Sequence, residues 1–183
     1  MRKKALLVIF ILLIALSTSL YAGNTFGLGL VNYYAYADLE AQNFEAYVPG
    51  LRAEFFFADY IGVSGDFMYL GSLGPINFAT LVANAVFRLP LGAIEPYIAT
   101  GPAYLMAFDD EGNYEVADSA LAYNVRGGVD FNIMDWLSIG AEVNFFVQDV
   151  VEFFDVLANS TSEEITEAIK TASKIGIIAK IKF

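Results

Sequence analysis

The stretch "GVDFNIMDWLSIGAEVNFFVQ", residues 128–148, contains two runs of alternating apolar and polar residues, one on either side of Met134-Asp135-Trp136. The apolar positions are Val129, Phe131, Ile133, Leu137, Ile139, Ala141, Val143, Phe145 and Val147. The positions opposite them hold Gly128, Asp130, Asn132, Ser138, Gly140, Glu142, Asn144 and Gln148. Because successive side chains of a strand point to opposite faces, this alternation predicts two strands with unlike faces joined by a short turn.

The composition extends this β-pattern to the rest of the chain. Of the 183 residues, 57% are hydrophobic, and the chain holds 15 glycines, 11 tyrosines and 16 phenylalanines, which favours strands over helices. After Leu16, no segment approaches the roughly 18 uninterrupted apolar residues of a membrane helix. The length fits a single domain.

The N-terminus has the layout of a secretory signal peptide. Arg2, Lys3 and Lys4 precede the apolar run "ALLVIFILLIAL" (5–16), and "STSLYAG" follows with small residues, which predicts cleavage after Ala22. The alternative is a retained N-terminal anchor, but the run is too short to span a bilayer. We therefore expect a signal peptide over 1–22 and a barrel domain over 23–183. With no cysteine in the chain, neither a lipoprotein acylation site nor a disulfide is expected.

Charge argues against a nucleic-acid partner. Removing 1–22 takes away three of the ten basic residues and none of the 21 acidic ones, so the net charge falls from −11 to −14. Nucleic-acid binding requires Lys and Arg to neutralise phosphates.

The pattern predicts eight strands, near residues 26–36, 47–57, 61–70, 78–88, 95–107, 119–132, 137–148 and 174–183. Their connections alternate in length. The short ones are 58–60, 89–94 and 133–136, and the long ones are 37–45, 71–77, 108–118 and 149–173. Short turns at one end and long loops at the other are typical of a transmembrane barrel. We therefore predict an all-β fold, an eight-stranded antiparallel up-and-down transmembrane β-barrel with short periplasmic turns and longer extracellular loops.

The polar face could look outward, as in a soluble lipocalin-like barrel, or inward, as in a membrane barrel. Its richness in Gly, Ser and Asn fits a crowded interior. Aromatic residues near strand ends fit interfacial girdles: Phe57, Tyr60, Tyr97, Trp136, Phe145 and Phe183. Arg52 and Arg126, both near mid-strand, would each cost about 2–4 kcal/mol if they faced lipid. The apolar face is therefore expected outside. Asn32 falls on that face, which predicts a bulge or a different register in the first strand.

Three segments carry a resemblance to a known family: "EPYIATGPAY" (95–104), "GVDFNIMDWLSIGAEVNF" (128–145) and the terminal "IGIIAKIKF" (175–183). They resemble the small eight-stranded outer-membrane β-barrel proteins, the OmpA/OmpX-like or "porin family" barrel domain. The resemblance implies a place in the outer membrane of a diderm bacterium, contact with its lipid, and assembly by the barrel-insertion machinery. It also implies an insertion signal at Ile177, Ala179, Ile181 and Phe183. The sequence departs from the family at Ile181, where an aromatic is frequent, and at Pro102, which interrupts the fifth strand.

The residues offer little chemistry. With no His and no Cys, the usual general base, thiol nucleophile and best transition-metal ligands are missing. Asp109-Asp110 and "DDEGNYE" are better interpreted as a solvated acidic loop than as an acid–base pair or calcium site. We expect no catalytic, cofactor or metal site. The expected function is that of a non-enzymatic, monomeric structural and surface-contact protein with an unidentified loop partner. The alternatives are a narrow pore or small-solute transport barrel and, third, a periplasmic lipocalin-like binder.

Two interior charge pairs follow from the turns. A three-residue turn centred on Asp59 sets Arg52 opposite Asp66, and one centred on Met134 sets Arg126 opposite Glu142. Glu54 and Asp130 would lie nearby. We expect these interior charge pairs to neutralise and plug the lumen; a shift of two residues would leave only diagonal contact.

The last loop contains "SEEITEAIKTA" (162–172), in which Ile165 and Ile169 are four residues apart and Ser160 and Glu163 are spaced like a capping box. This predicts a short amphipathic helix over the barrel mouth, with a loop whose apolar residues pack locally as the alternative.

Overall fold

The structure is a computed structural model that describes residues 25–36, 39, 47–109, 114–115, 121–147, 161–162, 166, 169–170 and 173–183. The predicted signal peptide (1–22) lies outside the described residues, as do most residues of the predicted loops 37–45 and 149–173. No helix among the described residues is long and apolar enough to cross a membrane.

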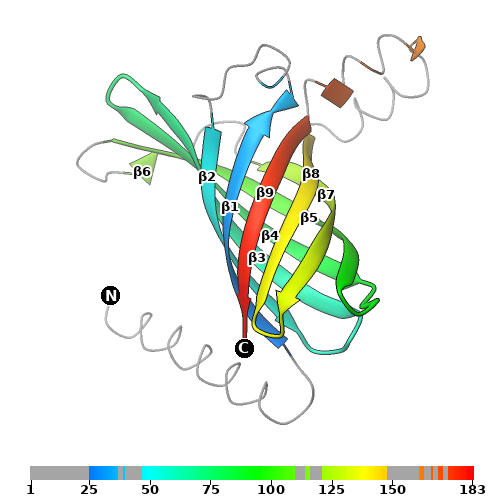
Figure 1. Ribbon diagram of the computed structural model, residues 1–183. Helices are drawn as coiled ribbons and strands as arrows, with labels where there is room; N and C mark the ends of the chain where they lie inside the picture. Colours follow the sequence, from blue (N-terminus) through cyan, green and yellow to red (C-terminus); the bar gives the residue numbers. More distant parts are fainter. Residues whose placement is uncertain are drawn as a thin grey trace, which may run out of the picture.

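The described chain forms strands almost throughout (Figure 1). They are β1 (Thr25–Ala35), β2 (Tyr47–Phe56), β3 (Ile61–Leu73), β4 (Ile76–Arg88), β5 (Ile94–Asp109), β6 (Tyr114–Glu115), β7 (Leu121–Met134), β8 (Leu137–Val147) and β9 (Ser173–Lys182). Eight of them follow one another in the order β4-β3-β2-β1-β9-β8-β7-β5, and a pairing of β4 with β5 closes the ring. The predicted all-β, eight-stranded antiparallel barrel is confirmed.

The seam between the first and last strands is closed by backbone hydrogen bonds. Phe183 donates to the Phe26 carbonyl at 2.7 Å, and Phe26 donates to the Phe183 carbonyl at 3.3 Å. The start of β1 and the C-terminus therefore lie at the end of the barrel that carries the short turns (Figure 1).

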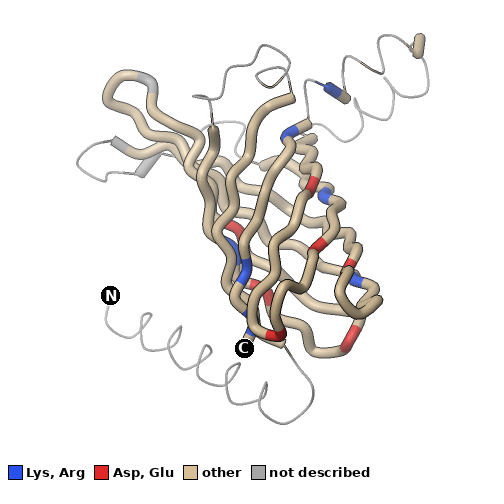
Figure 2. Tube along the Cα trace, in the orientation of Figure 1, with Lys and Arg blue, Asp and Glu red and all other residues tan. Residues whose placement is uncertain are grey.

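At the opposite end, β3, β4 and β5 project beyond the ring, and β6 adds a short strand to β5 (Figure 1). The predicted loop 71–77 is instead mostly strand, because Gly74 and Pro75 form a tight turn between Leu73 and Ile76. Gly74 has φ +61°, which suits the first central residue of a type II′ hairpin turn. The projecting hairpin carries no charged residue (Figure 2).

Pro49 explains where the projection begins. The pairing of β2 with β3 stops at Gly50 and Met68, one residue short of Pro49. Proline has no N–H to donate to a neighbouring strand, so the ladder ends there and β3 continues without β2.

Pro102 has a smaller effect than expected, because β5 runs through it. Only the ladder to β4 is interrupted: the registered pairs pass from Val82↔Ala103 to Ala85↔Thr100. The backbone stays extended at Pro102. The missing N–H removes local pairing with β4 but does not end the strand.

The two faces of the wall differ as predicted. Leu28, Leu51, Phe67, Ile98 and Ile139 lie outward and are exposed, whereas the intervening positions of their strands are buried. Two expectations are wrong. Asn32 lies outward on an unbroken strand, since β1 pairs with β2 and β9 without any register shift. Tyr97 lies inside the barrel and is 8% exposed, so it is not an interfacial aromatic.

Of the predicted helix 162–172, the structure describes Ser162, Thr166, Ile169 and Lys170, and all four are helical. Thr166, Ile169 and Lys170 line a cleft of about 320 Å³ with the outward-facing Val143, Phe145 and Ile175. These residues therefore lie beside the outer wall of β8 and β9 and not over the mouth of the barrel, because the cleft that they line is bounded by outward-facing side chains of these strands.

Candidate functional site

The lumen contains a central network built around Glu142 of β8. Arg52 of β2 donates from its two terminal nitrogens to Glu142 Oε2 and Oε1, each at 2.7 Å. The hydroxyls of Tyr33 and Tyr97 also donate to this carboxylate. Arg52 and Glu142 are 1% and 2% exposed. Four side chains from strands far apart in the sequence thus meet in a site that excludes water.

Asp66 of β3 is the second acceptor of this network. It accepts from Arg52 Nε, and from Arg126 Nη1 at 3.0 and 2.9 Å to its two oxygens. Arg126 Nε lies 3.7 Å from Glu142 Oε2, and Arg126 Nη2 donates to Ser64 Oγ at 2.9 Å. Two arginines and two carboxylates therefore alternate around a ring, in which every charge has two neighbours of opposite sign.

The two predicted pairs fare differently. Arg52 lies directly opposite Asp66, as a three-residue turn centred on Asp59 requires. Arg126 lies opposite Asn144, and Glu142 lies opposite Gly128, so the predicted opposition of Arg126 and Glu142 is wrong by two residues. The register shifts between Asn132 and Met134, where the turn is Asp135-Trp136 instead of three residues centred on Met134. Only the diagonal contact remains.

Gly128 makes room for the central network. A Cβ at this position would lie 2.7 Å from the Tyr97 hydroxyl and 2.7 Å from Glu142 Cβ. Only glycine lets β7 approach these side chains so closely.

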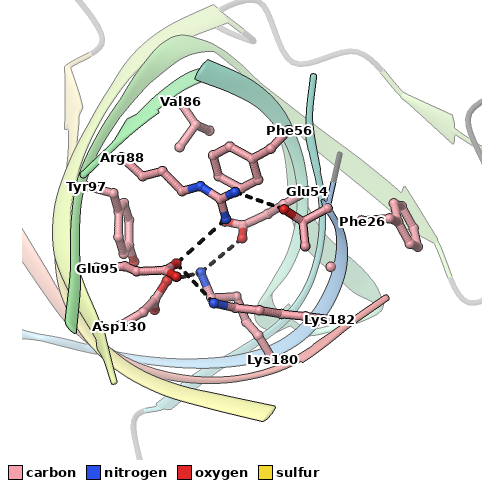
Figure 3. Close-up of a pocket in the computed structure, with 12 residues that line it drawn as sticks. Phe26, Glu54, Phe56, Val86, Arg88, Glu95, Tyr97, Asp130, Lys180 and Lys182 are labelled. Carbon is pink, nitrogen blue, oxygen red and sulfur yellow. Dashed lines mark hydrogen bonds and ion pairs between the residues drawn. The ribbon is translucent and has the colours of Figure 1, made fainter. Parts of the chain in front are cut away.

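A second group of charges, drawn in Figure 3, lies nearer the short turns, because its residues are close to the turn-side ends of their strands. Lys180 of β9 donates to Glu54 Oε2 at 2.9 Å and forms an ion pair with Asp130. The predicted interior residues Glu54 and Asp130 therefore share a lysine, and Glu54 Oε1 lies only 4.0 Å from Arg52 Nη1.

Glu95 of β5 is the centre of the outermost part of this group. Lys182 donates to it at 3.0 Å, Arg88 Nη1 lies 3.6 Å away, and Asn132 donates at 2.8 Å. Figure 3 shows Arg88, Glu95 and Lys182 converging from different strands. The Arg88 guanidinium also stacks 3.7 Å above the Phe56 ring.

Four partners in this group were absent from the pairs expected from the sequence: Arg88, Glu95, Lys180 and Lys182. Alternation places Lys180 and Lys182 on the polar face of the last strand, but it does not reveal their acceptors, because these come from β2, β5 and β7. Tyr33 and Tyr97 were missed for the same reason.

The ion-paired charges of the described lumen balance, and little space is left around them. Its ion pairs join five basic side chains to five acidic ones: Arg52, Arg88, Arg126, Lys180 and Lys182 with Glu54, Asp66, Glu95, Asp130 and Glu142. The cavity within the turn-side group measures about 10 Å³, room for about one water molecule. A pocket of about 500 Å³ opens at the turn-side mouth, where Arg88, Glu95 and Lys182 form part of its lining.

Toward the projecting end the lumen is filled by apolar side chains. The buried members are Val31, Tyr33, Met68, Val82, Ala103 and Ile178, with Val48, Ala122 and Phe146 packed against them. Most of this apolar layer lies beyond the central network along the strands, for example Met68 beyond Asp66. Ile178 of β9 is the exception, because it lies opposite Gly140 and so on the turn side of Glu142. Charge and hydrocarbon together therefore occupy the lumen over most of its length.

The four residues of the expected insertion signal lie on the outer face of β9 and at its end. Ile177 and Phe183 are each 61% exposed and Ile181 is 46% exposed, and Ala179 is exposed between them. The Phe183 and Phe26 ring centroids are 6.0 Å apart. These side chains form a continuous apolar stripe beside the closing seam.

Among the described residues, no group of three or more His, Cys, Asp and Glu side chains could hold a metal ion. The acidic segment around Asp110 falls largely outside the described residues.

Comparison with known proteins gives structural likeness without sequence likeness. No protein-family model matches the chain. No curated protein matches it either.

Among solved structures, the N-terminal β-barrel domain of Pseudomonas aeruginosa OprF is similar with a TM-score of 0.59 at 10% identity, covering 87% of this chain and 97% of that one. A de novo designed transmembrane β-barrel is similar with a TM-score of 0.50 at 12% identity, covering 87% and 95%. The chain has the fold of the small eight-stranded outer-membrane barrels.

Proposed function

We propose that this protein is a non-enzymatic barrel of the outer membrane of a diderm bacterium, where it contributes to envelope structure and makes surface contacts through its loops. The observation that carries the proposal is the combination of an apolar outer wall with a filled, charge-balanced lumen. The sequence-predicted signal peptide and terminal apolar stripe would serve its export and its insertion by the barrel-insertion machinery.

The apolar side chains of the outer wall favour a location of the barrel in lipid. Exposed Leu30, Leu51, Phe67, Ile98 and Phe131 are distributed around the barrel, and a soluble protein rarely leaves so continuous an apolar surface in water. Closure of the barrel also gives the backbone N–H and C=O groups of each strand hydrogen-bond partners in the neighbouring strands, as the hydrocarbon region of a membrane requires. The periplasmic lipocalin-like alternative would need the opposite arrangement, with an apolar ligand cavity inside.

The filled lumen favours a barrel without an open channel rather than a pore. Glu142 and Asp66 hold two arginines across its middle. The cavity within the turn-side group admits about one water molecule. An eight-stranded barrel has an interior just wide enough for side chains to fill.

The negative charge of the loop side favours a role in surface contacts. Fourteen of the 21 acidic residues of the sequence lie at 38–45, 109–118 and 149–167, on the side of the long connections. A surface of this kind favours basic partners and repels nucleic acid.

The test has two parts. First, the tagged full chain is expressed in a diderm host and the envelope is fractionated; we expect the protein in the outer-membrane fraction, released only by detergent. Recovery in the periplasmic extract without detergent would contradict the proposal.

Second, the purified protein is inserted into planar bilayers. We expect no steady conductance from the wild type, whereas Arg52→Ser/Asp66→Ser should admit small ions by removing two side chains that cross the lumen. The matched control is Leu51→Ser, on the lipid side of the same strand. Stable channels in the wild type would favour a pore instead.

A further inference from the structure

Asn32 is a polar residue in an apolar surface. It lies on the outer face of β1, directly between Pro49 of β2 and Ile177 of β9, in a ladder without irregularity. Within the part of the barrel wall that the structure describes, it is the one outward-facing side-chain amide, since Asn77 belongs to the projecting hairpin. Its amide makes no hydrogen bond in the described chain, whereas the outward Thr100 hydroxyl donates to the Asn124 carbonyl at 3.0 Å.

The depth of Asn32 makes this isolation costly in a membrane. Outward-facing tyrosines occur at the loop-side ends of five strands: Tyr34, Tyr47, Tyr69, Tyr104 and Tyr123. Tyrosines at such positions mark the interface of a bilayer. Asn32 lies two residues inside Tyr34, about 5 Å deeper for a strand tilted by roughly 40°. Its side chain has a single methylene and cannot reach back to water or headgroups, so the amide is left without partners in hydrocarbon.

A second copy of the same chain can supply the hydrogen-bond donor and acceptor that lipid tails lack. A carboxamide has both donors and acceptors, so two asparagines related by a two-fold axis can each donate to the other's oxygen. Leu30 and Leu51 surround Asn32 and are 66% and 58% exposed, and the rigid Pro49 ring stands beside it. These neighbours can exclude lipid around a central polar contact.

We propose that two copies associate in the membrane through the outer faces of β1, β2 and β9, with the Asn32 amides hydrogen-bonded across the two-fold axis. The inference rests on the proposed membrane location and replaces the monomer expected from the sequence. Polar residues on the lipid side of a spanning segment commonly mark such contacts.

Cysteine cross-linking tests the geometry, and the native chain contains no cysteine to interfere. Leu30→Cys places a thiol beside Asn32 on the same face, and Ile98→Cys on β5 is the matched control on the opposite wall. In vesicles, a short bifunctional thiol reagent should trap a dimer with Leu30→Cys and not with Ile98→Cys. Asn32→Leu in the Leu30→Cys background should reduce trapping strongly. Equal trapping at both positions would mean random collision and overturn the proposal.

Energy transfer between labelled copies tests the contribution of the amide. Asn32→Leu should weaken association in vesicles about tenfold, the size expected for one or two hydrogen bonds within a membrane. Wild-type protein that inserts, migrates differently before and after boiling, and stays monomeric would overturn the dimer while leaving the proposed function intact. Protein that never enters the bilayer would overturn both. Unchanged association of Asn32→Leu would overturn the proposed contact between the Asn32 amides.

Discussion

Toward the short turns the lumen is filled mainly by charged side chains, beside a small apolar cluster of Phe56, Val86 and Ala99. Toward the projecting end it is filled mainly by apolar side chains. Glu142 lies in the first region and accepts hydrogen bonds from Arg52, Tyr33 and Tyr97, whereas Met68 packs in the second against other buried hydrocarbon. Both fillings exclude water, but they depend on composition differently. An ionic filling requires that every charge keep its partner, while an apolar filling requires only volume.

The largest effect should come from removing a carboxylate at the centre of the ionic region. Glu142→Ala leaves Arg52 and Arg126 to share Asp66 and takes the acceptor from two tyrosine hydroxyls. Breaking such a buried pair costs about 3–5 kcal/mol of the free energy of unfolding. Urea unfolding in lipid vesicles measures it. A loss below about 1 kcal/mol would mean that water or rearrangement neutralises the site.

A double-mutant cycle should next identify which arginine is coupled to Glu142. For Arg52→Ala with Glu142→Ala we expect a coupling energy of up to about 3 kcal/mol, because two hydrogen bonds of 2.7 Å join them. The cycle with Arg126→Ala should give less, since its closest approach is 3.7 Å. Additivity within about 0.5 kcal/mol in both cycles would show that neither arginine is coupled to Glu142 and would contradict the network.

Gly128→Ala should destabilise the barrel by about 1–3 kcal/mol, the usual cost of overpacking. Its new methyl would lie 2.7 Å from the Tyr97 hydroxyl, whereas a methyl at the adjacent Gly127 would come no closer than 3.9 Å to its nearest neighbour. Gly127→Ala is therefore the control and should change stability little. Equal effects of the two substitutions in the same unfolding assay would place the cost in the backbone and not in the network.

The smallest effect should come from the apolar cluster to which Ile178 belongs. Ile178 is fully buried, and Ile178→Val should cost about 0.5–1.5 kcal/mol by removing one methylene. The preceding residue, Ile177, faces lipid and is 61% exposed, so Ile177→Val should cost almost nothing. If both changes were equal, burial in the lumen and contact with lipid would be energetically equivalent at this depth.

The sequence predicts the parts of this architecture that depend on neighbouring residues. Alternation identified the strands and their faces, and the Arg52–Asp66 opposition followed from one short turn. The Arg126–Glu142 register failed because a single turn residue decides it, and nothing near Met134 distinguishes a two-residue from a three-residue turn. Contacts across the lumen, such as Tyr33 with Glu142, depend on how the ring closes, which no local pattern specifies.

The lysines of β9 have a consequence for the order of assembly. Before the last strand docks, the described lumen holds three arginines against the five carboxylates Glu54, Asp66, Glu95, Asp130 and Glu142, an excess of two negative charges. Lys180 and Lys182 supply two positive charges in the same step that joins Phe183 to Phe26. An unfinished barrel therefore attracts its own final strand electrostatically, and the attraction ends once the ring is closed.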